Sequence, residues 1–152
     1  MAFYDIQEVL DYMHDLLDTN KGELGLRYVG YGDEQILPEY PACQIIPGAV
    51  TRELHGTQRF RNVWNLEIYV YHGLLTVSYS RRVKEDLQLV ARVRSMLHSN
   101  MRFVVNGEAQ IVQGWIDSES PGVLTAKGDV IVGTRLTWRG EGHEPYTLPQ
   151  GG

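Results

Sequence analysis

The residues VWNLEIYVYH at positions 63–72 decide the fold class. Apolar side chains at every second position alternate there with polar or phenolic ones, which is the period of a β-strand with one buried face. The set predicted to be buried is Trp64, Leu66, Ile68 and Val70. The opposite set, which includes Tyr69 and Tyr71, is predicted to face away from the core.

Two amphipathic helices are predicted on either side of this strand in the sequence. The first begins after Asp5, whose carboxylate with Glu8 fits a capping box, and its apolar residues recur at steps of three and four up to Leu17. The motif NKG at residues 20–22 is predicted to end it. The second helix is predicted from about Ser80, as the amino-terminal cap, to His98.

The other strands are shorter and are separated by turn residues. They are predicted at residues 26–31, 42–46, 49–54 and 130–139, with a hairpin over 101–116 that turns at Asn106-Gly107. Residues 117–129 are predicted to form a loop. The segment 42–46 lies between prolines, so an edge or irregular strand is expected there.

These elements predict an α+β fold: a two-layer, mostly antiparallel β-sheet with two amphipathic helices packed on one face. Residues 1–139 are expected to form one domain. Residues 140–152 hold four glycines and two prolines and little apolar content, so a flexible carboxy-terminal tail is expected.

Composition bounds the function classes. The chain has 152 residues, 14 Lys and Arg, 19 Asp and Glu and a net charge of −5, which argues against a strongly basic nucleic-acid-binding face. The single cysteine, Cys43, excludes an internal disulfide and a zinc site built from clustered cysteines. No apolar run is long enough to span a membrane and no signal peptide is seen at the amino terminus, so we expect a protein made in the cytoplasm.

A search for catalytic and binding motifs finds no phosphate-binding glycine loop, no nucleophile elbow and no histidine pair at metal-ligand spacing, so neither a metal nor a cofactor is expected. Two functional alternatives stay open. An enzyme site would combine His72, Glu67 and Cys43. A nucleic-acid-binding surface would use four basic residues of the second helix, Arg81, Arg82, Arg92 and Arg94.

Mixtures of tyrosine and arginine are typical of protein interfaces. Such a mixture is expected on the outer strand face, at the start of the second helix and on the last strand. The predicted subunit or partner interface comprises Tyr69, Tyr71, Arg81, Arg82, Arg135 and Arg139.

Several segments together resemble a known family. They are WNLEIYVYH at 64–72, the helix RVKEDLQLV at 82–90 with its end at Leu97-His98, and GWI at 114–116 with SPG at 120–122. In pattern and size they are similar to the tail terminator (tail completion) proteins of long-tailed bacteriophages. The resemblance covers residues 3–139 and is strongest over 64–122.

The resemblance implies a structural virion protein without catalysis or cofactor. Six copies would form a ring on the head-proximal end of the tail tube, stop tube polymerisation and join the tail to the head connector. Its partners would be other copies of itself, the tail tube protein and the head–tail connector protein. DNA would pass through the channel without specific binding, and assembly would take place in the host cytoplasm. Another head–tail joining protein, such as a neck or connector completion factor, is the alternative within this class.

Overall fold

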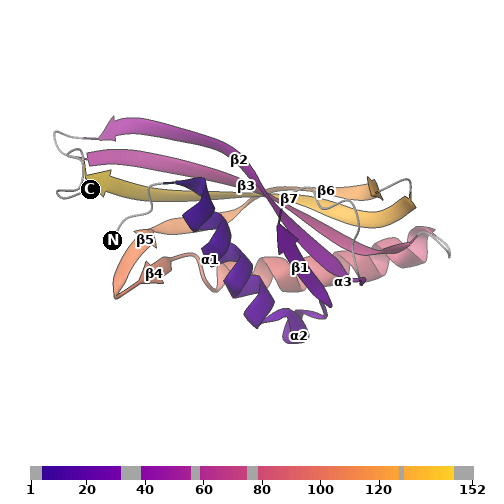
Figure 1. Cartoon of the computed structure of the whole chain (residues 1–152). Helices are drawn as coiled ribbons and strands as arrows, with labels where there is room; N and C mark the ends of the chain where they lie inside the picture. Colours follow the sequence, from indigo (N-terminus) through magenta and orange to yellow (C-terminus); the bar gives the residue numbers. More distant parts are fainter. Residues whose placement is uncertain (1–4, 32–38, 56–58, 75–78, 127–128, 146–152) are drawn as a thin grey trace.

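The computed structural model describes residues 5–31, 39–55, 59–74, 79–126 and 129–145. It is an α+β fold built on a mostly antiparallel five-stranded sheet, as predicted (Figure 1). The helices are α1 (Ile6–Thr19), α2 (Lys21–Leu24) and α3 (Tyr79–His98), and the strands are β1 (Tyr28–Tyr31), β2 (Ala42–His55), β3 (Arg59–Leu74), β4 (Phe103–Val105), β5 (Glu108–Ile111), β6 (Gln113–Ala126) and β7 (Asp129–Pro145).

The sheet has the strand order β1-β2-β3-β7-β6. The short β1 runs parallel to β2, and the other neighbours are antiparallel. Strands β4 and β5 form a separate hairpin that turns at Asn106 and Gly107, both with positive φ, as the sequence predicts. In the part of the chain that the structure describes, no helix is long and apolar enough to cross a membrane.

Both long helices agree with the amphipathic patterns. The carboxylate of Asp5 accepts a hydrogen bond from the backbone N–H of Glu8 at 3.1 Å, which confirms the predicted cap of α1. Two details differ. Helix α3 begins at Tyr79, so Ser80 lies inside the helix instead of capping it, and the residues expected to end the first helix contribute to the additional short helix α2.

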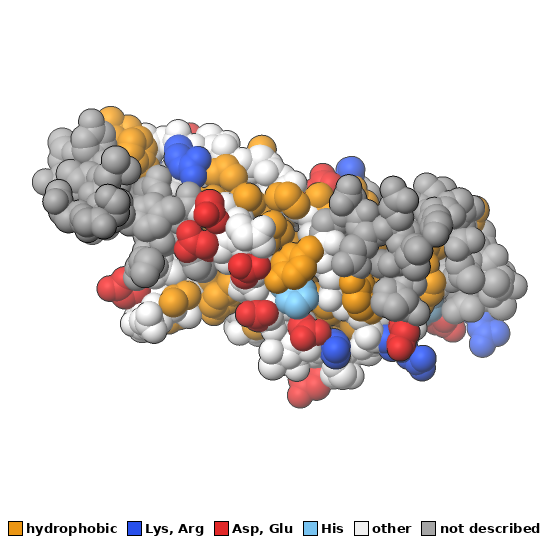
Figure 2. Space-filling model, viewed as in Figure 1, with side chains coloured by type: hydrophobic (Ala, Val, Ile, Leu, Met, Phe, Trp, Pro, Cys, Tyr) orange, Lys and Arg blue, Asp and Glu red, His pale blue; other side chains and the backbone are white. Residues whose placement is uncertain are grey.

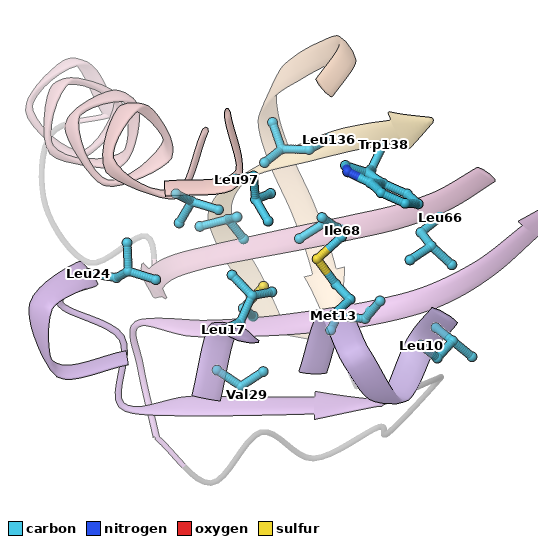
Figure 3. Close-up of a cluster of buried hydrophobic side chains, with 14 of the residues drawn as sticks. Leu10, Met13, Leu17, Leu24, Val29, Leu66, Ile68, Leu97, Leu136 and Trp138 are labelled. Atoms are coloured by element: carbon cyan, nitrogen blue, oxygen red, sulfur yellow. The ribbon is translucent and has the colours of Figure 1, made fainter. Parts of the chain in front are cut away.

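One hydrophobic core joins the helices to the sheet. The even-numbered residues of β3, from Trp64 to Val70, are buried in it, as the alternation predicts. Helix α1 packs against β1 and β2, whereas α3 packs against β3, β6 and β7. Figure 3 shows Met13 and Leu17 of α1 and Leu97 of α3 gathered with Leu66, Ile68, Leu136 and Trp138 of the sheet.

Strand β2 continues through Pro47, with an irregularity in its pairing to β3 between Pro47 and Val50. Glycine is needed at position 48, because an added Cβ would lie 2.8 Å from the backbone oxygen of Asn65. The expectation of an edge strand at 42–46 is wrong for residues 42–45, which pair with β1 on one side and β3 on the other. Beyond Ile45, β2 pairs with β3 alone among the described strands.

Two predicted segments are longer strands than expected. The loop predicted at 117–129 is wrong, because β6 runs to Ala126 in register with β7. Pro121 is accommodated because β6 is at the edge of the described sheet, where a missing N–H breaks no ladder. Residues 140–145 are likewise not a tail but the end of β7, paired with β3. The rest of the expected tail, 146–152, lies outside the described residues.

Candidate interaction surface

The face of the sheet opposite the core carries four of the six residues predicted to form an interface, three of them close together. Glu67, Tyr69 and Tyr71 alternate with the buried residues of β3, and the register places Arg135 of β7 and Gln44 of β2 directly beside Tyr69. We call these five residues the tyrosine face. The structure therefore brings Tyr69, Tyr71 and Arg135 together, as the sequence predicts for residues on one strand face.

Hydrogen bonds hold the two phenols of the tyrosine face. Tyr69 donates to the Glu67 carboxylate at 3.1 Å, Tyr71 donates to the Gln44 side-chain oxygen at 3.2 Å, and the two rings stack with centroids 6.2 Å apart. Burial and the bond to Glu67 raise the pKa of Tyr69, and the nearby Arg135 opposes that rise. The phenols therefore stay protonated and act as donors at neutral pH.

Tyr71 differs from its neighbours in exposure. It is 7% exposed and packs with Ala42 and Ile131 in a small second hydrophobic core. Its role is therefore packing beneath the tyrosine face. Burial raises the pKa of Tyr71 to about 12. Tyr69 is half-buried and Arg135 is exposed, so these two are the members of the predicted set that a partner could touch here.

Arg139 lies further along the same face in a charged cluster. Its guanidinium is 3.7 Å from the Glu141 carboxylate and lies 5.9 Å from the centroid of the Trp115 ring. Glu141 also pairs with Arg61, which reaches Glu53 of β2 at 3.5 Å. The cluster joins β2, β3 and β7 through side chains, in addition to their backbone ladder.

The remaining two predicted residues are on α3, away from the tyrosine face. Arg81 is exposed, and its Nε lies 3.6 Å from the Glu85 carboxylate one helical turn later. Arg82 is in the same first turn, and its side chain lies outside the described part. The six predicted residues thus divide between a sheet face and a helix terminus and do not form one surface.

The three groups of the enzyme alternative do not converge. Cys43 is fully buried in the core, and burial raises its thiol pKa to about 12, which disfavours the thiolate. Glu67 is on the opposite face of the sheet. His72 forms a hydrogen bond of 2.9 Å between its Nε2 and Oε2 of Glu85. Within the described ranges, no three His, Cys, Asp or Glu residues are placed to hold a metal ion.

Besides Arg81, which lies near Glu85, two members of the basic set proposed for nucleic acid have partners on other elements of the fold. Arg92 donates from Nε to the backbone oxygen of Leu24 at 2.9 Å, which ties α3 to α2. Arg94 forms an ion pair with Glu119 of β6. These contacts use the guanidinium groups to connect elements of the fold.

Helices α2 and α3 also border an open groove of about 480 Å³. Its wall is mostly apolar, with polar side chains that include Glu23 from α2 and Arg92 and Ser95 from α3. No cluster of groups suited to catalysis is found among its lining residues.

The sequence analysis missed a buried polar pair beneath α3. Asp86 is 1% exposed, and its Oδ2 accepts a hydrogen bond of 2.6 Å from the hydroxyl of the fully buried Thr134 on β7. Burial raises the pKa of Asp86, whereas the Thr134 bond and the electrostatic effect of the nearby His72 lower it. Oδ1 of Asp86 and Nδ1 of His72 find no partner among the described residues. The signal available in the sequence was a carboxylate on the apolar side of the predicted second helix.

No family model and no curated protein matches the chain. Among solved structures, one chain whose name describes no function is similar to this one. The match covers 97% of this chain and 100% of that chain. The sequence identity is 16% and the TM-score is 0.45. A likeness of that size carries no functional argument, so the functional conclusion rests on the residues described above.

Proposed function

We propose that this chain is a structural subunit of a bacteriophage tail, of the tail terminator type. Six copies close into a ring on the head-proximal end of the tail tube, stop its polymerisation and join it to the head connector. The partners are other copies of the chain, the tail tube protein and the connector protein, and the subunit needs no cofactor.

One observation carries the proposal: the outer face of the long sheet presents residue types that are enriched at protein interfaces. Tyr69 and Arg135 lie side by side on that face, and Arg139 lies beside Trp115 further along it. Tyrosine, tryptophan and arginine are the residues most enriched at the centres of protein interfaces. In the proposed subunit, α1 and α3 form a second layer over the core face and leave the outer face to neighbours.

The edges of the sheet support assembly as well. The part of β6 beyond Ile116 and the part of β2 beyond Ile45 each pair on one side within the described sheet. Nearer its start, β6 donates outward from the N–H of Gly114 to the Met101 oxygen and from the N–H of Ile116 to His98. Two different free edges suit a heterologous contact, which repeats from subunit to subunit until a ring closes. A ring of this kind needs no active site.

The charge distribution is compatible with a channel that conducts DNA without gripping it. Cationic side chains that contact phosphates add salt-dependent affinity. Arg61, Arg92 and Arg94 have partners within the chain, and the net charge is −5. We therefore expect weak, non-specific contact with the DNA.

The test is the native mass of the purified chain over a wide concentration range, together with electron microscopy. The expected particle is a six-fold ring with an open centre and a mass near six times 17.3 kDa. If the chain is monomeric in solution, the same imaging is repeated after tail tubes are added. Tubes that remain uncapped and continue to grow would refute the proposal, and a ring that binds the connector but not the tube would indicate another head–tail joining protein.

A further inference from the structure

Helix α1 carries an uninterrupted acidic stripe. From its cap, Asp5, to its last residue, Thr19, the chain has five carboxylates, the cap included, and no Lys or Arg. The stripe consists of Glu8, Asp11, Asp15 and Asp18, spaced by three or four residues, so that these residues lie along one side of the helix. The side chain of Asp15 is 81% exposed. Figure 2 shows acidic side chains gathered on the face that α1 presents to the viewer.

Helix α3 has the opposite character. Five of its residues are Lys or Arg against two carboxylates, Glu85 and Asp86, and Asp86 is buried. Its first turn contains no acidic residue. We call Arg81 and Lys84 the basic turn, since both are exposed, Arg81 with 75% of its side chain accessible.

The carboxyl-terminal half of the acidic stripe, Asp15 and Asp18, and the basic turn each carry the charge that their own helix end disfavours. Carboxylates near the carboxyl end of α1 and cations near the amino end of α3 oppose the respective helix dipoles. Lys21 offsets Asp18 at 3.2 Å, and Glu85 offsets Arg81 at 3.6 Å. Exposed pairs of this kind contribute little, so an opposite charge from outside would stabilise both helix ends.

The two stripes are on different parts of the fold. Helix α1 packs against β1 and β2, at one side of the strand order, and α3 packs most against β6 and β7, at the other. Another copy of this chain carries both an acidic and a basic helix surface, so it can complement either surface in charge. We propose that the acidic stripe of one copy binds the basic turn of the next copy, head to tail. The inference rests on the proposed ring and names its contact.

The test uses two charge reversals and their mixture. Asp15→Lys/Asp18→Lys reverses the charge of the carboxyl-terminal half of the acidic stripe, and Arg81→Glu/Lys84→Glu reverses the charge of the basic turn. Each reversal improves the match to its own helix dipole but turns one exposed ion pair, with Lys21 or with Glu85, into a like-charge pair of similar size. The melting temperature is therefore expected to change little. Self-association of each variant alone is expected to weaken by at least about tenfold, because like charges face each other across the contact.

An equimolar mixture of the two variants is expected to restore assembly, because copies that alternate bring opposite charges together at every contact. An alternating ring has an even number of copies, which six satisfies. Matched controls reverse the same amount of charge at exposed positions off both stripes, Glu39→Lys/Asp117→Lys and Arg27→Glu/Arg102→Glu. The controls are expected to assemble as the unchanged chain does.

The outcomes separate this contact from the proposed function. A ring that persists in both reversals, or a mixture that fails to assemble, overturns the contact and leaves the ring proposal in place. Restoration that yields a closed pair instead of a ring supports the contact and counts against a tail terminator. A basic turn used for nucleic acid would leave the Asp15→Lys/Asp18→Lys variant fully associated, which also overturns the contact. A chain that is monomeric at every concentration, alone and with tail tubes, overturns both.

Discussion

Replacing Thr134 by valine tests the hydrogen bond that ties α3 to β7. Valine keeps the shape of threonine and removes the donor to Asp86, whose Oδ2 accepts at 2.6 Å. Asp86 and Thr134 are both buried, so water does not readily replace the lost bond. A buried charged acceptor left without its donor costs about 1–3 kcal/mol, and we expect Thr134→Val to lower the unfolding free energy by about 2–3 kcal/mol at neutral pH.

The loss of unfolding free energy in Thr134→Val should depend on pH in a defined direction. Burial raises the pKa of Asp86, so the folded chain holds its proton to a higher pH than the unfolded chain does. The unfolding free energy that depends on Asp86 is therefore highest below its unfolded pKa and falls as the pH rises through its folded pKa. Removal of the Thr134 donor takes away a bond to the charged form, so the loss in Thr134→Val should grow over the same range.

Urea unfolding at pH 4 and pH 8 measures this effect. Thr134→Ser is the matched control, because it keeps the hydroxyl and removes one methyl group, at a cost of about 1 kcal/mol. Asp86→Asn keeps an acceptor without the charge, and its unfolding free energy relative to the unchanged chain should rise with pH. A Thr134→Val cost below about 0.5 kcal/mol, or one equal at both pH values, would refute the reasoning.

Three further predictions concern stability and reactivity. Gly140→Ala places a Cβ 2.2 Å from the Trp138 ring and should cost about 1–3 kcal/mol in urea unfolding, whereas Gly122→Ala, with open space around it, should differ little from the unchanged chain. Asp5→Ala removes the cap of α1 and should lower the unfolding free energy by about 1 kcal/mol, and no change in thermal melting would contradict that role. Cys43 is fully buried, so a thiol reagent should label it in native buffer at the rate of unfolding and at once in denaturant. Fast native labelling would contradict the burial.

The strand at 63–72 and both long helices were predictable because their periodicity is local and strong. The buried side of β3, the cap at Asp5 and the turn at Asn106-Gly107 each follow from a few neighbouring residues. The tyrosine face was predictable for the same reason, since residues two apart on a strand share a face.

The ends of β6 and β7 were not predictable, because glycine and proline there respond to partners that are distant in sequence. Glycines 114 and 140 allow the Trp138 indole to lie against the strands, and Gly142 allows close approach to the backbone oxygen of Gln110. From composition alone, the glycines and prolines of residues 140–152 predict a flexible tail. The Asp86–Thr134 bond joins residues 48 positions apart, so no local pattern could reveal it.

The pairing of β3 with β7 has a consequence for the order of folding. Strand β3 is at the centre of the sheet, yet its neighbour on one side is the last strand along the described chain, with Arg59 opposite Pro145. Contacts so far apart in sequence form slowly, and a nascent chain lengthens by about 5–20 residues per second. During synthesis, one edge of β3 is therefore expected to stay unpaired after β1, β2 and β3 have been made. Its partner β7 follows only after α3, the β4–β5 hairpin and β6. We therefore expect the pairing of β7 with β3 to be a late step that closes the sheet.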